Sequence, residues 1–185
     1  MTANITRPLP TEHAPYASLY VDTAARAMAE LGNDDIITLL HDQPDQLREL
    51  LTSAFADDVT ARQRYAPDKW TLGESLVHMA DTERVFAYRA LRIARGDQTP
   101  LAGFEQDEWV PHSRADRRSL ADILDEIDAV REATLALALS LDREAVAAIG
   151  TAGGVTVSVR ALMWIIAGHF AHHIAVTRDR YVAGV

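Results

Sequence analysis

The chain of 185 residues contains no cysteine, and this absence excludes several kinds of site. Without thiols the protein has no disulfides, no zinc ribbon, no iron–sulfur cluster and no thiol nucleophile of its own. Its hydrophobic fraction of 48% and its charged fraction of 24% are ordinary for a folded protein. A chain of this length buries enough surface to fold as one domain without covalent cross-links.

Positive charge is scarce: 18 lysines and arginines stand against 27 acidic residues, giving a formal net charge of −9. This net negative charge argues against a nucleic-acid-binding protein, which needs a basic surface. The densest group of arginines alternates with acidic residues, so we expect it to form a solvated helix face. The residues of this face are Asp81, Glu83, Arg84, Arg89, Arg92, Arg95 and Asp97.

Long apolar runs are missing as well. The first residues, MTANITRPLPTEHAPY, lack the apolar segment of a signal peptide. No stretch approaches the roughly 18 consecutive apolar residues of a membrane span. We therefore expect a cytoplasmic protein that binds neither nucleic acid nor membrane.

Prolines and capping patterns divide the chain into segments. Residues 1–15 contain three prolines and predict an extended N-terminal arm, followed by one helical domain over residues 16–182. Capping boxes at Thr71–Glu74 and Ser119–Asp122 predict two helix starts, and Ser158 predicts a third. Apolar residues then recur at helical spacing. The expected long helices are Pro44–Ala56, preceded by a cap at Asp42, then Thr71 to the Gly96–Asp97 pair, Ser119–Leu141 and Ser158–Tyr181; shorter candidates are Tyr16–Leu31 and Asp34–His41.

The connections complete a fold prediction. A long loop runs from Gly96 to about Arg118, and loops of that length are usually functional or well packed. Residues 150–154 break the chain before an extended stretch at Val155–Val157. Four amphipathic helices without a strand pattern predict an all-α protein, a four-helix bundle.

Two of the seven histidines, His169 and His173, lie one helical turn apart on the expected core-facing side of the last helix. Buried imidazoles need partners, and one metal ion satisfies both at once. A hydrogen-bonded buried pair or an exposed pair is the alternative. The intervening residues include no glutamate, which argues against a zinc protease. His78, flanked by Ser75 and Thr82, is either a third ligand on a cavity wall or an exposed histidine.

Several segments together resemble the DinB-like superfamily, especially its YfiT-type branch. They are Tyr65–Thr71, Gly73–Arg84, Phe86–Asp97, Gly103–Glu108 and Ala167–His173, within a likeness that extends from about Asp34 to Tyr181. The resemblance implies a four-helix bundle with an open divalent-metal site whose ligands are His78, His169 and His173. The chain departs from the family pattern at Phe170 and Ala171, where a charged and a large apolar residue are common.

Three readings of function follow, of which the characterised branches of this superfamily imply the first two. The first is a metal-dependent transferase that activates a low-molecular-weight thiol of the mycothiol or bacillithiol type. A cosubstrate thiol suits a chain without cysteine, because a metal-bound thiol is deprotonated. The second is a hydrolase, in which water at the metal, with its pKa lowered toward ~7, takes the place of the thiol. The third is a non-catalytic, stress-associated bundle that binds metal or ligand.

Supporting residues and partners follow from the same reasoning. Thr82 and Asp81 lie one turn beyond His78 and could hold its second nitrogen or a bound water, although Asp81 also suits an ion pair with an arginine. Arg89 lies three turns from His78 and could anchor an acidic cosubstrate. Phe104 and Trp109 either line a pocket or belong to the core. We expect zinc, then nickel, as the metal, a small-molecule substrate, and a homodimer formed through apolar residues near Tyr16–Tyr20.

Overall fold

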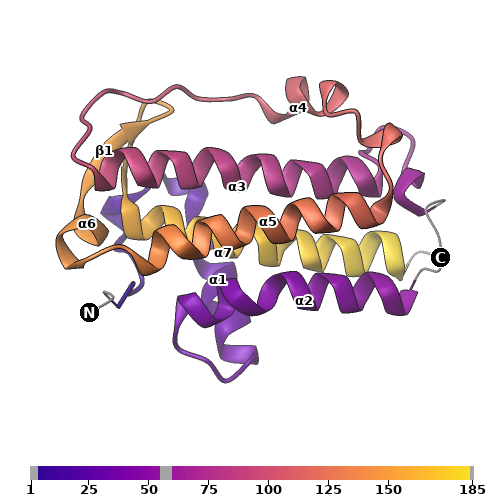
Figure 1. Ribbon diagram of the computed structural model, residues 1–185, viewed down its shortest axis with the longest axis horizontal. Coiled ribbons are helices and arrows are strands. Elements are labelled where there is room, and N and C mark those ends of the chain that lie inside the picture. Colours follow the sequence, from indigo (N-terminus) through magenta and orange to yellow (C-terminus); the bar gives the residue numbers. More distant parts are fainter. Residues whose placement is uncertain (1–3, 55–59, 184–185) are drawn as a thin grey trace.

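The computed structural model describes residues 4–54 and 60–183, and four long helices lie side by side along its longest axis (Figure 1). They are α2 (Ile36–Ala54), α3 (Leu72–Ala94), α5 (Leu120–Leu139) and α7 (Val159–Val176), and α7 continues into a π-helical turn at Thr177–Val182. A further helix, α1 (Ser18–Glu30), packs mainly against α7. The predicted all-α four-helix bundle is confirmed. The predicted end of the α2 helix at Ala56 lies outside the described residues.

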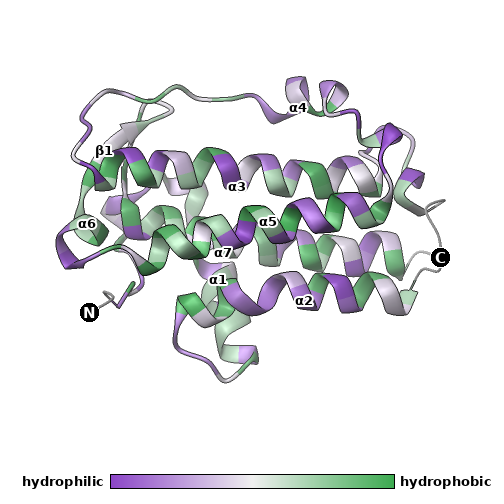
Figure 2. Ribbon diagram, viewed as in Figure 1, coloured by the Kyte–Doolittle hydropathy of each residue, from purple (hydrophilic) through white to green (hydrophobic). Residues whose placement is uncertain are grey.

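The helix starts follow the capping patterns of the sequence. The Thr71 hydroxyl accepts from the Glu74 amide, and the Glu74 carboxylate accepts from the Thr71 amide. Ser119 and Asp122 make the same reciprocal pair before α5, and the Ser158 hydroxyl accepts from the backbone of Ala161 before α7. These bonds satisfy amide donors that have no partner within a helix, which fixes where each helix begins. Figure 2 shows hydrophobic and hydrophilic residues alternating along α3 and α5, as amphipathic helices require.

Pro44 lies inside α2, so the predicted break between Asp34–His41 and Pro44–Ala56 is wrong. A proline nitrogen cannot donate to the carbonyl four residues earlier, and in an ordinary helix that loss favours a break. Here the freed carbonyl belongs to Leu40, and the guanidinium of Arg131 donates to it at 2.5 Å. A side chain 91 residues away thus replaces the missing helix hydrogen bond. His41, the last residue of the shorter predicted helix, consequently lies within α2, and its side chain is exposed.

The chain also contains a small hairpin, which the absence of a strand pattern did not predict. Strands β1 (Ile149–Ala152) and β2 (Val155–Ser158) pair antiparallel, with Gly153 and Gly154 at positive φ in the turn. The predicted extended stretch Val155–Val157 forms most of β2. Leu101 of the long loop forms a bridge with Ala152, so the hairpin also holds that loop. Two short helices precede the hairpin in the chain. They are α4 (Gln106–Trp109), in the long loop, and α6 (Arg143–Ala147), directly before β1.

The arginine-rich face of α3 is not uniformly solvated, which corrects the sequence-based expectation. Glu83 is 4% exposed and Arg89 is 8% exposed. Glu83 forms a two-pronged ion pair with Arg131 of α5, both bonds at 2.8 Å, in the centre of the bundle. The other arginines on α3 remain at or near the surface. Periodicity places residues on a helix but does not reveal which charges find a buried partner.

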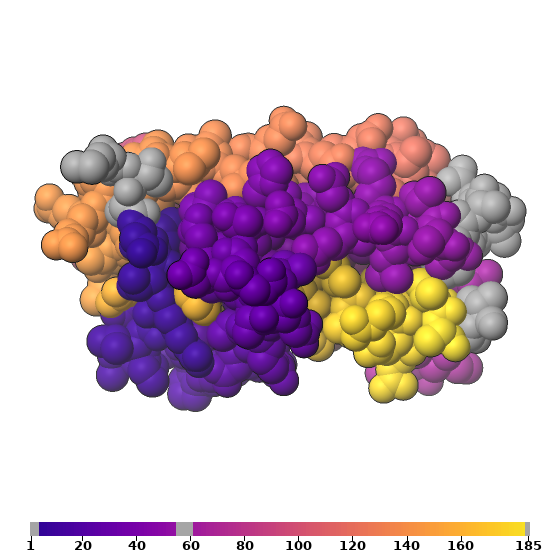
Figure 3. Space-filling view, turned by 90° about the horizontal axis from the view of Figure 1, so that it is seen from below, coloured from indigo at the N-terminus to yellow at the C-terminus, as the bar shows by residue number. Residues whose placement is uncertain are grey.

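Residues 4–17 are fastened to the bundle. Ile5 is 2% exposed, and its carbonyl accepts from the indole nitrogen of Trp164 at 2.9 Å. The carboxylate of Glu12 accepts from Arg160 and from Ser158 at the start of α7. In Figure 3 this indigo segment and α1 cover one half of the face, while yellow residues near the end of α7 are visible in the other half.

The helix Val159–Val182 is long and apolar enough to cross a membrane by length and composition, contrary to the expectation that no segment approaches this limit. Most of its apolar window, 67%, is buried inside the protein. Buried residues include Leu162, Met163 and Ile166. The apolar character of this segment is that of the central helix of a bundle.

Candidate metal centre

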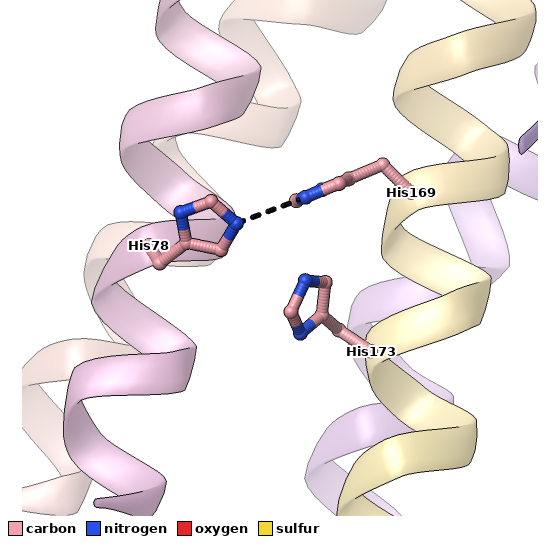
Figure 4. Close-up of side chains that lie close together, drawn as sticks. All are labelled: His78, His169 and His173. Carbon is pink, nitrogen blue, oxygen red and sulfur yellow. Dashed lines mark hydrogen bonds between the residues drawn. The ribbon is translucent and has the colours of Figure 1, made fainter. Parts of the chain in front are cut away.

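Three histidines from two helices meet inside the bundle. His78 projects from α3 toward His169 and His173 on α7 (Figure 4). Each offers a ring nitrogen, and these three atoms lie within 4.8 Å of one another. All three residues are buried, with exposed fractions between 5% and 9%. The helical spacing of 169 and 173 accounts for one pair, and the packing of α3 against α7 adds the third ring.

The nearest contact joins the two helices directly. The Nε2 atoms of His78 and His169 lie 3.0 Å apart. The ring centroid of His173 lies 4.5 Å from that of His169 and 5.1 Å from that of His78. Two ligand nitrogens at about 2.0–2.1 Å from a tetrahedral zinc ion are roughly 3.3 Å apart. The His78–His169 spacing is close to that of two ligands on one ion, and the nitrogen of His173 lies near enough to complete the set.

Hydroxyl groups lie near the second nitrogens of two rings. Ser75 Oγ lies 3.3 Å from Nδ1 of His173, and Thr82 Oγ1 lies 3.3 Å from Nδ1 of His78. When Nδ1–H donates to a hydroxyl oxygen, Nε2 keeps its lone pair for a ligand. Ser75 is thus placed to fix the orientation of the His173 ring, whereas the Thr82 hydroxyl contacts both nitrogens of His78, Nδ1 at 3.3 Å and Nε2 at 3.5 Å.

A glycine beside His169 lets a third helix reach the site. A Cβ atom on Gly168 would lie 1.8 Å from the carbonyl oxygen of Tyr20, so α1 approaches α7 closely only because glycine is there. The Tyr20 ring consequently packs edge to face with His169 and His172, with ring centroids 5.3 Å and 5.9 Å away. On the other side the Trp70 ring lies 4.8 Å from His78. These aromatic rings limit the movement of the histidines.

Burial keeps the three imidazoles neutral. Desolvation lowers the pKa of His78 to about 4, against a smaller opposing effect of Asp107. Desolvation, with smaller contributions from the neighbouring histidines, holds the pKa values of His169 and His173 well below the ordinary value. A neutral imidazole has the free lone pair that a metal ligand requires. The donor set present at pH 7 is therefore the one that a divalent ion binds.

The cluster is open to cavities on two sides. One cavity of about 360 Å³, named here the Arg89 cavity, reaches His169 and Thr82. A second cavity of about 530 Å³, named the Lys69 cavity, reaches His173 and Ser75. The segment Phe104–Asp107 of the long loop contributes to the walls of both. This position is consistent with the functional or packing role predicted for the long loop. Phe104 and Trp109 are both residues of the loop, and their ring centroids lie 5.0 Å apart.

The remaining candidate residues, and others that lie near the cluster, have different places. Asp81 pairs with Arg84 at 3.4 Å, and Glu74 serves the capping box. His172 is half-buried against Tyr20 and His173 and adds no atom to the cluster. Arg89 lines a cavity that also contains His169. Tyr20, Trp70 and Asp107 are further neighbours of the site that could not be predicted, because no sequence motif links them to the histidines.

Comparisons with known proteins agree on the fold. Residues 39–176 match the model of the DinB superfamily. Among solved structures, the chain is similar to YfiT from Bacillus subtilis, a probable metal-dependent hydrolase with an unusual four-helix bundle topology. The two are 16% identical with a TM-score of 0.68, over 94% of this chain and 93% of that chain. None of the curated proteins compared matches the sequence significantly.

Proposed function

The chain belongs to the DinB superfamily, and we propose that it is a divalent-metal-dependent hydrolase whose metal is bound by His78, His169 and His173. The observation that carries the proposal is the convergence of three buried ring nitrogens within 4.8 Å of one another. The structural likeness to YfiT, itself described as a probable metal-dependent hydrolase, supports the reaction class. No carboxylate belongs to this donor set, so the full charge of the ion is available to polarise a substrate.

When bound, the ion supplies a Lewis acid and lowers the pKa of water toward neutrality. The protein's own residues supply orientation and exclusion of solvent. Ser75 and Thr82 hold the Nδ1 sides of His173 and His78. Tyr20 and Trp70 cover the rings from α1 and from the segment before α3. Binding in a low-dielectric site strengthens the electrostatic effects on which such catalysis depends.

Elemental analysis of tag-free protein tests the first step of this proposal. We expect about one divalent ion per chain in the parent protein and none in the double variant His169→Ala/His173→Ala. His41→Ala is the matched control, because His41 is exposed and far from the cluster in the sequence; it should keep the ion. If the parent binds no ion even when zinc or nickel is offered, the hydrolase proposal fails.

Activity then separates hydrolase from binding protein. Metal-loaded protein should hydrolyse activated esters or amides without added thiol, and the double variant should not. A bound ion that raises the melting temperature without any turnover would instead favour the non-catalytic, stress-associated bundle.

A thiol transferase of the mycothiol or bacillithiol type is the second candidate, and one feature favours it. The histidine cluster is open to two cavities, the Arg89 cavity and the Lys69 cavity, and a transferase must bring two organic molecules to one ion. Hydrolysis needs only one. Consumption of a low-molecular-weight thiol with an electrophile, absent in a His173→Ala variant, would favour the transferase; turnover that is independent of every thiol offered favours the hydrolase.

Metal identity, assembly and location are also proposals. Three imidazoles suit zinc first and nickel next. Exposure of Tyr16 (73%) and Leu19 (52%) on the N-terminal side of α1 supports a homodimer through this region. Light scattering of the Leu19→Glu variant, which should be monomeric if this surface dimerises, provides the test. A cytoplasmic location and a small-molecule substrate remain part of the same proposal.

A further inference from the structure

The Arg89 cavity contains a buried positive charge without a partner of opposite sign. Arg89 is 8% exposed as a residue, and its guanidinium donates one hydrogen bond, to the carbonyl oxygen of Ala102 at 2.7 Å. Among the described residues, no carboxylate lies within ion-pair distance of it, whereas Arg131, which is 1% exposed, pairs with Glu83. Buried charges are ordinarily paired. An unpaired arginine in a cavity wall is therefore a candidate for ligand recognition.

The orientation of Arg89 is fixed by aromatic rings. Its guanidinium carbon lies 5.4 Å from the ring centroid of Phe86 and 5.5 Å from that of Phe104. Contacts with ring faces and the bond to Ala102 leave other guanidinium N–H groups without a protein acceptor. The guanidinium nitrogens that make no hydrogen bond keep some solvent-accessible surface, and Arg89 lines the cavity. Arginine presents these donors as a planar fork that matches a carboxylate.

Arg89 and the histidine cluster are connected along one face of α3. Residues 78, 82, 86 and 89 follow one another at helical spacing, and Thr82, Phe86 and Arg89 all line the Arg89 cavity with His169. Phe86 lies one turn closer to His78 than Arg89 does, and the guanidinium is positioned over its ring. Along the helix axis, Arg89 lies about three turns from His78, on the order of 16 Å, and its guanidinium packs back over the ring of Phe86, about two turns from His78. A small elongated molecule spans this distance.

The charges around the cavity favour a single negative charge on the ligand. Arg89 is the one cation that lines it among the described residues, and Glu105 lies at its exposed side. Glu105 repels a doubly charged phosphate about twice as strongly as a singly charged carboxylate, and Arg89 alone neutralises only the carboxylate. The aromatic rings of Tyr20, Phe86 and Phe104 provide apolar walls between the two ends. Cavities of this size with one fixed polar anchor are typical small-molecule sites.

We propose that the Arg89 cavity binds a substrate with a terminal carboxylate and an apolar body, with Arg89 holding the carboxylate while the other end reaches the histidine cluster. The identity of the reacting end rests on the proposed function, but the recognition of the carboxylate does not. Arg89 is accordingly a binding residue and takes no part in bond breaking.

Calorimetric titration of metal-free protein provides the test, because without an ion a carboxylate cannot simply coordinate the metal. The probes are 4-phenylbutyrate, its neutral amide and 4-phenylbutyl phosphate. We expect the parent protein to bind the carboxylate about tenfold or more tightly than the amide, and more tightly than the phosphate. Arg89→Gln should abolish the preference for the acid, and Arg89→Lys should keep part of it.

Arg95→Gln is the matched control, since Arg95 ends the same helix and is exposed; its preference should equal that of the parent. Circular dichroism verifies that each variant is folded, and the acid–amide comparison on the parent is independent of any variant. Equal binding of acid and amide, no binding of either, tighter binding of the phosphate, or an Arg89→Gln variant that keeps the preference would each overturn the inference. Absence of hydrolysis with the carboxylate preference intact would overturn only the proposed function.

Discussion

The Nε2 atoms of His78 and His169 lie 3.0 Å apart although 91 residues separate them in the chain. Two lone pairs cannot face each other at that distance without cost, so in metal-free protein one nitrogen must donate its hydrogen to the other. A divalent ion removes this requirement by accepting both lone pairs. The pair is thus arranged to gain from a metal ion, and protonation of either ring competes with that gain.

The stability of the metal-free protein should fall as the pH decreases from about 6.5 to about 4. Burial lowers the pKa of His78 to about 4, whereas an unfolded histidine titrates near 6.5. In this window the unfolded chain binds a proton that the folded chain does not, so acid favours unfolding. The free energy of unfolding should drop by roughly 1.4 kcal/mol per pH unit for this group, and His169 and His173 act in the same direction.

Denaturant titrations of EDTA-treated protein at pH 7, 6 and 5 measure this dependence. The variant His78→Gln should show a smaller change between pH 7 and pH 5. The control His41→Gln should match the parent, because the side chain of His41 is 72% exposed. A free energy of unfolding that is constant between pH 7 and pH 5 in the parent would contradict the buried, neutral state of the cluster.

Removing the hydroxyls that hold the Nδ1 atoms should weaken metal binding without unfolding the protein. Ser75→Ala frees His173, and Thr82→Val frees His78, each 3.3 Å from its hydroxyl partner. Loss of such a partner typically reduces metal affinity about 10–100-fold, because the ring can rotate and its ligand nitrogen becomes less basic. Competition with a chromophoric chelator gives the affinity directly.

Thr134→Val is the control for this pair of variants. Thr134 is equally buried, but its hydroxyl donates to the carbonyl of Val130 within α5 at 3.1 Å, away from the histidines. Its metal affinity should be that of the parent. Equal affinities in all four proteins would show that the hydroxyls do not orient the rings.

The sequence predicted the helices far better than it predicted the surroundings of the site. Capping boxes and apolar spacing depend on neighbouring residues, so Thr71, Ser119 and Ser158 could be recognised as helix starts in advance. Pro44 was misinterpreted because its compensation comes from Arg131, which is distant in sequence. His78 was predicted to join His169 and His173 only through a family resemblance, since spacing alone left it either exposed or on a cavity wall. The burial of Glu83 and Arg89 depends on tertiary packing, which no local pattern encodes.

Breaking the buried ion pair should destabilise the fold severely. Arg131→Met leaves the carboxylate of Glu83 uncompensated in the core and removes the donor to Leu40, so we expect a loss of about 3–5 kcal/mol in the free energy of unfolding. The double variant Glu83→Gln/Arg131→Met should recover part of this loss, because no unpaired charge remains. Chemical denaturation measures both.

Arg178→Met provides the comparison for an exposed pair. Arg178 bonds Asp179 at 2.8 Å, but both side chains are 59% exposed. Solvent screens this pair, so the change should stay within about 0.5 kcal/mol. A double variant less stable than Arg131→Met alone would mean that Glu83 has a second role in the core beyond pairing with Arg131.

Gly168→Ala should damage both the fold and the metal site. The added methyl group would lie 1.8 Å from the carbonyl oxygen of Tyr20, which is backbone and cannot rotate away. Helix α1 must then move from α7, at an expected cost of about 3 kcal/mol or more. Because α1 carries the Tyr20 ring that packs against His169, metal affinity should fall as well.

Gly103→Ala is the matched control: its methyl group would meet the nearest atom, Cα of Gly153, at an ordinary 3.7 Å. Stability and affinity equal to the parent in Gly168→Ala would mean that the close approach of α1 is not what positions His169.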